Sequence, residues 1–136
     1  MYQEFGAAFE ALIDSYDGVQ YVFEQGFYAR FKFRKTDAMN DPHPYRYALS
    51  LHAPSGKRLM GFDNAHAVTR KAGRFARRSE TADHWHRDRS DKGRPYNFES
   101  PQKLLDDFFA EVERVLKEIG VPIEAIGVRR DNETSN

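Results

Sequence analysis

Two stretches of the chain carry apolar residues at helical spacing. The first covers residues 5–16, where apolar positions recur every three or four residues until a glycine follows. The second runs from Leu104 to Ile119, with Ser100 as a helix cap and Pro101 at the first helical position. This spacing places the apolar side chains on one face of a helix. The pattern predicts a short N-terminal helix and a long C-terminal helix.

Between these helices the pattern changes to alternation. Apolar and polar residues alternate over 27–35 and again over 45–51, which is typical of half-buried strands. A Pro-Ser-Gly turn at 54–56 then leads into residues 58–63, so the last two segments form a predicted hairpin. The apolar run at 19–23 precedes the first strand through Glu-Gln-Gly, either as a separate strand after a tight turn or as part of one long bent strand.

These elements predict an α+β fold, in which an antiparallel sheet of three to four strands packs against an N-terminal and a long C-terminal helix. The helices cover one face of the sheet, and the other face stays partly open to solvent. At 136 residues the chain suffices for one domain. We expect a single domain over residues 1–128 that contains a long basic loop at 65–95, followed by a polar tail at 129–136. Basic residues of the alternating strands lie on the open face: Arg30, Lys32, Arg34 and Arg46.

Charge is unevenly distributed. The whole chain is neutral, with 21 basic and 21 acidic residues. Residues 65–95 nevertheless hold nine Lys and Arg residues against four Asp and Glu residues, an excess of five positive charges. A local basic surface on a neutral protein favours a polyanionic target, because Lys and Arg neutralise phosphates whatever the nucleotide sequence.

The composition of the chain excludes sites that depend on cysteine and indicates the cellular compartment. The chain has no cysteine, which excludes disulfides, thiolate zinc sites and a cysteine nucleophile, and fits a reducing compartment. No apolar run approaches the roughly 20 residues that span a bilayer. The first residues lack the basic start and apolar core of a signal peptide. We therefore expect a cytoplasmic protein without a membrane partner.

The candidate chemistry lies around His84 and His86. Histidine donates or accepts a proton near neutral pH, and Asp63, at the end of a predicted strand, can orient one of the two rings. One histidine then serves as general base and the other as general acid, while Arg87 with neighbouring Arg89 steadies the phosphate. This equipment suits RNA cleavage without metal or other cofactor. The predicted RNA-binding residues are Arg74, Arg77, Arg78, Trp85, Arg89 and Arg94.

Other uses of the same residues remain open. His84 and His86 with Asp63 form a legitimate ligand set for zinc or manganese, although the segment around them is poor in strand formers. The His-x-His pair also fits a solvated connection, and Asp63 with Asn64 fits a turn. Trp85 suits either the edge of the core or stacking on a base.

Four segments follow one another between residues 62 and 108: Phe62-Asp63-Asn64, Asp83-His84-x-His86, Arg94-Pro95-Tyr96-x-Phe98-x-Ser100 and Leu104-Leu105-x-x-Phe108. Together they resemble the TumE-type toxins of prokaryotic toxin–antitoxin modules. The similarity covers about residues 26–120, and residues 65–82 depart from it by being long and arginine-rich.

This resemblance implies a toxin that inhibits growth and is neutralised by a cognate antitoxin, usually a DNA-binding protein. The ribonuclease hypothesis comes instead from the candidate residues. A non-catalytic module that binds nucleic acid or a protein through the same basic loop is the alternative. An antitoxin or regulator is a third hypothesis, without support from any helix-turn-helix pattern, and self-association to a homo-oligomer stays open.

Overall fold

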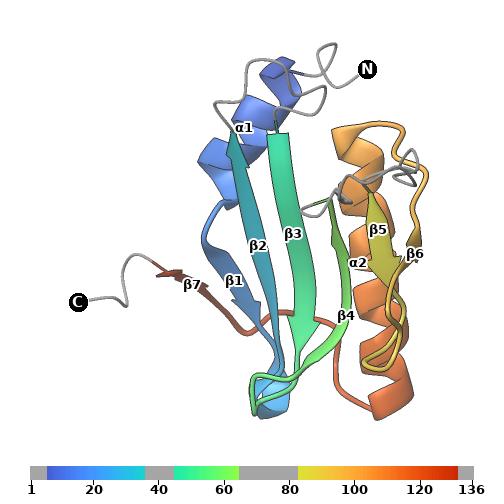
Figure 1. Cartoon of the computed structure of the whole chain (residues 1–136). Helices are drawn as coiled ribbons and strands as arrows, with labels where there is room; N and C mark the ends of the chain where they lie inside the picture. Colours follow the sequence, from blue (N-terminus) through green and yellow to red (C-terminus); the bar gives the residue numbers. More distant parts are fainter. Residues whose placement is uncertain (1–5, 36–44, 65–82, 132–136) are drawn as a thin grey trace.

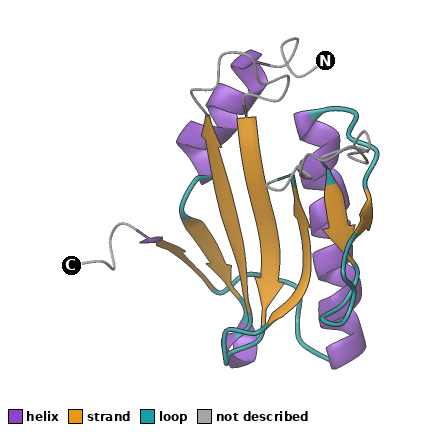
Figure 2. Ribbon diagram, viewed as in Figure 1, coloured by secondary structure: helices purple, strands orange, loops and turns teal. Residues whose placement is uncertain are grey.

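The computed structural model describes residues 6–35, 45–64 and 83–131 (Figure 1). Within these ranges the chain forms two α-helices, one short 3-10 helix and seven β-strands. Both α-helices lie where the apolar spacing predicts them (Figure 2). The elements in chain order are α1 (Gly6–Tyr16), β1 (Val19–Val22), η2 (Glu24–Gly26), β2 (Tyr28–Lys35), β3 (Tyr45–His52), β4 (Arg58–Asp63), β5 (His84–His86), β6 (Arg94–Pro95), α2 (Pro101–Ile119) and β7 (Gly127–Arg130).

The described strands form one antiparallel sheet in the order β6-β5-β4-β3-β2-β1-β7. The α+β class is as predicted, but three to four strands is too few. Strands β5, β6 and β7 account for the difference, and they lie at the two edges of the sheet. Each has only two to four residues. Such short strands exist because a neighbouring strand offers its backbone hydrogen-bonding groups, which the local sequence pattern does not reveal.

Both helices cover the same face of the sheet, as Figure 1 shows. The ring of Phe31 on β2 contacts both of them, with its centroid 5.0 Å from that of Tyr16 on α1 and 5.4 Å from that of Phe108 on α2. The core therefore lies between the helices and the sheet. Its fully buried large side chains include Phe9, Phe31, Phe33, Tyr47, Leu49, Leu51, Met60, Leu104, Phe108 and Leu116.

Helix α2 begins and ends as its sequence predicts. The Ser100 side chain accepts a hydrogen bond from the Lys103 backbone N–H, and Pro101 follows the cap. Gly120 ends the helix in the left-handed region, at φ 91°, where its N–H reaches the last carbonyls. The backbone groups at both ends of the helix therefore have hydrogen-bond partners.

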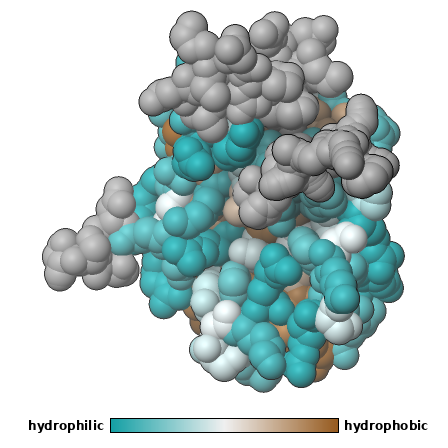
Figure 3. Space-filling view, in the orientation of Figure 1, coloured by the Kyte–Doolittle hydropathy of each residue, from teal (hydrophilic) through white to brown (hydrophobic). Residues whose placement is uncertain are grey.

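The opposite face of the sheet carries polar side chains, because successive residues of a strand point to opposite faces. On β2, buried Phe31 and Phe33 alternate with Arg30, Lys32 and Arg34. The described surface in Figure 3 is largely hydrophilic. We call this face the open face, and the strand register assigns to it Gln20, Arg30, Lys32, Arg34, Arg46, Ala48, Ser50, Asp63, His84 and His86.

The chain returns to the sheet after α2. Strand β7 pairs with β1, and the Asp131 backbone N–H then donates to the Gly18 carbonyl. The Asp131 carboxylate forms an ion pair with Arg30, 3.2 Å away. The described part of the C-terminal segment, through residue 131, is thus tied to the sheet. No helix in the described ranges is long and apolar enough to cross a membrane.

Candidate functional site

Strand β5 brings both candidate histidines beside Asp63. The register pairs Asp63 with His84, Phe62 with Trp85 and Gly61 with His86. Phe62 points into the core, where its ring stacks on that of Trp85 with centroids 5.5 Å apart. Asp63 and the two histidines therefore share the open face. The stacked aromatic pair beneath them holds β5 in this register.

His86 is held between a carboxylate and a backbone carbonyl. Its Nε2 lies 3.3 Å from Asp63 Oδ2, and its Nδ1 lies 3.0 Å from the Asp91 carbonyl oxygen. A carbonyl oxygen only accepts hydrogen bonds, so Nδ1 carries a hydrogen. The other ring nitrogen, Nε2, faces the Asp63 carboxylate. The His86 side chain is 12% exposed, against 20% for Asp63, so the contact between them lies mostly away from solvent.

The turn after β5 supplies the carbonyl that holds His86. The Asp91 carboxylate accepts hydrogen bonds from the backbone N–H groups of Arg87 and Gly93, at 2.9 Å each, and from Arg94 Nε at 2.8 Å. The Arg87 N–H is the largest cause, followed by that of Gly93, of the lowered pKa of this carboxyl. The turn is therefore shaped by an ionised Asp91, which fixes the position of its own carbonyl.

Gly93 lies directly against the imidazole of His86. Its φ is 122°, a conformation that side chains rarely adopt, and a Cβ there would come within 3.0 Å of His86 Cε1. Glycine at this position thus satisfies two requirements. It completes the turn and leaves room for the ring.

Asn64 and Asp83 are buried and form hydrogen bonds that hold neighbouring strands together. Asn64 is fully buried, where its Oδ1 accepts from the Tyr47 N–H and its Nδ2 donates to the Tyr45 carbonyl. Asp83 is also buried and accepts a hydrogen bond from the Tyr47 hydroxyl, while its carbonyl accepts from the Tyr96 N–H. These residues join the ends of β3, β4 and β5, so they position Asp63 and His84.

Along the chain, His84 lies two residues before His86 and Arg87 follows directly after it. Among the described residues, no hydrogen bond or ion pair engages the His84 ring. The Arg87 carbonyl accepts a hydrogen bond from Arg114 Nη2 of helix α2, at 2.9 Å. Its backbone is therefore held at both the N–H and the carbonyl.

The predicted RNA-binding residues do not share one place. Trp85 lies on the helix-covered face of β5, and the Arg94 guanidinium lies over its ring, 5.3 Å from the centroid. Arg89 is exposed and, with Lys57 and Arg58, lines a hollow of about 430 Å³. Arg74, Arg77 and Arg78 lie outside the described residues. The sequence gives no signal for Lys57 or Arg58 in this role, because they follow an ordinary hairpin turn.

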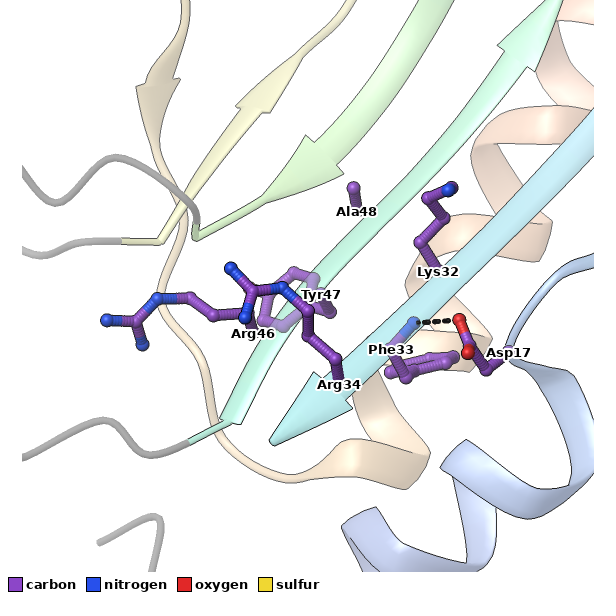
Figure 4. A pocket seen from close by; sticks show the side chains of 7 residues that line it. All are labelled: Asp17, Lys32, Phe33, Arg34, Arg46, Tyr47 and Ala48. Atoms are coloured by element: carbon purple, nitrogen blue, oxygen red, sulfur yellow. Dashed lines mark hydrogen bonds between the residues drawn. The ribbon is translucent and has the colours of Figure 1, made fainter. Parts of the chain in front are cut away.

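A second basic hollow lies on β2 and β3 (Figure 4). It has a volume of about 290 Å³, and Lys32, Arg34 and Arg46 contribute its cationic side chains. The register pairs Ala48 with Lys32 on one side and with Asp63 on the other. Along the surface of the sheet, the methyl group of Ala48 therefore lies between Lys32 in this hollow and Asp63.

Within the described ranges, no group of three or more His, Cys, Asp or Glu side chains is arranged to bind a metal ion. Asp63 and His86 form a two-membered contact.

A family model described as toxin TumE matches residues 13–116. The chain belongs to the TumE toxin family. The match covers well over half of the chain and includes Asp63, His84, His86 and both basic hollows. It confirms the resemblance seen in the sequence. No curated protein and no solved structure matches the chain. Membership of the TumE family makes the protein a toxin of a toxin–antitoxin module, with a cognate antitoxin as its partner.

Proposed function

We propose that this toxin acts by cleaving RNA, as a metal-independent ribonuclease. One observation carries the proposal: the His86 imidazole lies between the Asp63 carboxylate and the Asp91 carbonyl, on a sheet face with basic hollows on both sides. His86 and Asp63 supply groups for proton transfer, and the basic side chains beside them suit the phosphates of a polyanionic substrate.

In this mechanism His86 is the general acid. With Nδ1 bound to the Asp91 carbonyl, the proton on Nε2 is the one available for transfer. Asp63 keeps the ring oriented and balances its charge until a leaving 5′ oxygen takes the proton. Gly93 and Asp91 are positioning residues, since they act only through the place of this ring.

His84 is the general base of the same mechanism. It is the direct cross-strand neighbour of Asp63 on the open face, and no described residue occupies its ring nitrogens. A neutral ring there can accept the proton of a ribose 2′-hydroxyl, which then attacks the adjacent phosphorus. Arg87, next along the chain, offers charge to the phosphate as negative charge develops on it.

The substrate is held by charge. The hollow of Lys32, Arg34 and Arg46 and the hollow of Lys57, Arg58 and Arg89 together offer six cations on the two sides of the Asp63 and His86 pair. Cations separated in this way suit successive phosphates of one strand better than a small anion. We further propose cytoplasmic action and a DNA-binding antitoxin, and we leave self-association as a hypothesis.

A binding module without catalysis is the second candidate, and the two basic hollows favour it equally. The two functions separate in one experiment with the purified chain, His86→Ala and His84→Ala. The ribonuclease proposal expects each variant to bind single-stranded RNA as wild type does, while cleavage falls by roughly 100-fold or more. RNA binding by the wild type without cleavage would favour the module instead.

A further inference from the structure

A serine and a histidine on β3 form a pair on the open face, apart from Asp63 and His86. Ser50 Oγ lies 2.8 Å from His52 Nε2, and His52 Nδ1 lies 3.0 Å from the Gly56 carbonyl oxygen. Because that carbonyl only accepts, Nδ1 carries the hydrogen, and Nε2 of the neutral ring accepts from the Ser50 hydroxyl. A hydroxyl, a base within reach and a third group that orients the base are the arrangement of an activated serine.

The surroundings of His52 favour its neutral form. Tyr28 stacks on the imidazole with ring centroids 4.9 Å apart. Burial is the largest cause of a lowered pKa for His52, and the charges of Arg30 and Arg58 lower it further, against the opposing hydrogen bond to Gly56. At neutral pH the ring is thus available as a base.

Arg30 places an unsatisfied cationic donor beside Ser50. It is the direct cross-strand partner of Ser50 on β2, and its Nη2 is paired with Asp131. Its Nε is buried and, among the described residues, has no hydrogen-bond partner. Buried donors normally have a hydrogen-bond partner. An acceptor oxygen close to Arg30 Nε would therefore remove the energetic cost of this unpaired donor.

Gly61 lies beside Ser50 on the neighbouring strand β4. A Cβ on Gly61 would lie 3.1 Å from the Leu49 carbonyl oxygen, 3.3 Å from Arg58 Cδ and 3.5 Å from Ser50 Cβ. A larger residue at this position would therefore crowd the Ser50 and Arg58 side chains. Arg58 also lines the larger basic hollow, through which an anionic donor can approach.

We propose that Ser50 is a phosphoryl-acceptor site, with His52 as its base and a phosphoric anhydride as the donor. In the transfer, Ser50 Oγ forms a bond to phosphorus and its proton passes to His52 Nε2. The bond from phosphorus to the leaving oxygen breaks, and that oxygen departs with the electron pair as a phosphate or carboxylate anion. Arg30 and Arg58 balance the charge of the transferred group.

Phosphorylation of Ser50 would also regulate the toxin, a consequence that rests on the proposed RNA cleavage. A phosphoserine carries nearly two negative charges near neutral pH. At position 50 these charges would lie between the two basic hollows and oppose the binding of RNA phosphates. The modified toxin would therefore bind RNA more weakly than the unmodified one.

The test treats the purified full chain with acetyl phosphate in one arm and with magnesium ATP in the other, and locates phosphoryl groups by mass spectrometry. We expect transfer to Ser50 in at least one arm, and the arms distinguish an acyl phosphate from a nucleotide donor. Ser50→Ala should lose the label. His52→Gln, which keeps a hydrogen-bonding side chain but removes the base, should slow labelling by about 100-fold.

Ser55 and Ser90 are controls within the same chain. Ser55 Oγ accepts from the Lys57 N–H and Ser90 Oγ donates to Asp88, so among the described contacts neither hydroxyl has a histidine base. Absence of label on Ser50 in both arms, equal labelling of Ser55 or Ser90, or unchanged labelling in His52→Gln would each overturn the proposal. Labelling of Ser50 in a protein that does not cleave RNA would uphold this site and contradict only the proposed ribonuclease.

Discussion

Gly93 faces the imidazole of His86 so closely that a single methyl group at position 93 would come within 3.0 Å of its Cε1 atom. The backbone of Gly93 is also in the left-handed range, at φ 122°. The place of His86, and with it the contact to Asp63, therefore depends on a residue that carries no chemistry of its own.

Gly93→Ala should accordingly impair the toxin while leaving the fold present. The added methyl displaces the His86 ring from Asp63, so we expect RNA cleavage and growth inhibition to fall by roughly 10-fold or more, as misplacement of a catalytic group does. Gly127→Ala is the matched control, because nothing lies within 4 Å of a Cβ there and its φ is not in the left-handed range. Activity of Gly93→Ala equal to that of the control would contradict this account of His86.

The turn that holds His86 should weaken in acid. The hydrogen bond from the Arg87 N–H, with lesser contributions from Gly93 and Arg94, lowers the pKa of Asp91 below its ordinary value of 3.8. Its ionisation therefore stabilises the fold above about pH 4, and this contribution is lost as the pH falls through the lower folded value.

Asp91→Asn tests that dependence. Urea unfolding of both proteins should show the wild type more stable at pH 7, with the difference shrinking as the pH falls below about 4. A stability difference that does not change between pH 7 and pH 3 would mean that the charge of Asp91 is not what holds the turn.

Helix α2 should close the core through Phe108. This residue is fully buried, with its ring against those of Phe31, Phe62 and Phe109. Phe108→Ala should destabilise the protein by about 3 to 5 kcal/mol in chemical unfolding. Ile119→Ala, at a side chain 45% exposed near the end of the same helix, should cost about 1 kcal/mol or less. Similar losses for the two variants would contradict the packing described here.

The smaller hollow should bind RNA through charge. Replacing Lys32 and Arg34 by Gln removes two of its cations, so affinity for single-stranded RNA should fall and its dependence on salt should become less steep. A double Gln variant of Lys103 and Lys117 removes the same charge from helix α2, on the other side of the sheet. Fluorescence titrations at several salt concentrations compare the two, and equal losses would show that net charge alone is responsible.

The sequence was sufficient for the elements whose pattern is local. Periodic apolar residues defined α1 and α2, and alternation with a Pro-Ser-Gly turn defined the hairpin of β3 and β4. The three short strands had no such pattern. His84, Trp85 and His86 form β5 because Phe62 stacks on Trp85 and the β4 backbone pairs with them, and both are contacts between residues distant in sequence.

The candidate site was predictable to a similar extent. Asp63 and His86 were selected by residue type and by resemblance, and the structure brings them together. The second partner of His86 is a backbone carbonyl, which every residue possesses, so residue type gives no signal for Asp91 in this role. A glycine two positions later is a weak local sign of a turn. The pairing of Ser50 with His52 could not be predicted from the sequence either, because the orientation of the His52 ring depends on its hydrogen bond to the Gly56 carbonyl in the hairpin turn.

In the proposed mechanism, His84 and His86 cleave RNA by proton transfer, with the ribose 2′-hydroxyl as nucleophile and no metal ion. The most direct measurement is the chemistry of the RNA ends formed by the purified wild-type toxin in the presence of EDTA. We expect cleavage under these conditions, with 2′,3′-cyclic phosphate and 5′-hydroxyl ends that disappear in His86→Ala. Cleavage that stops in EDTA and returns with one divalent ion, or that leaves 3′-hydroxyl and 5′-phosphate ends, would contradict it.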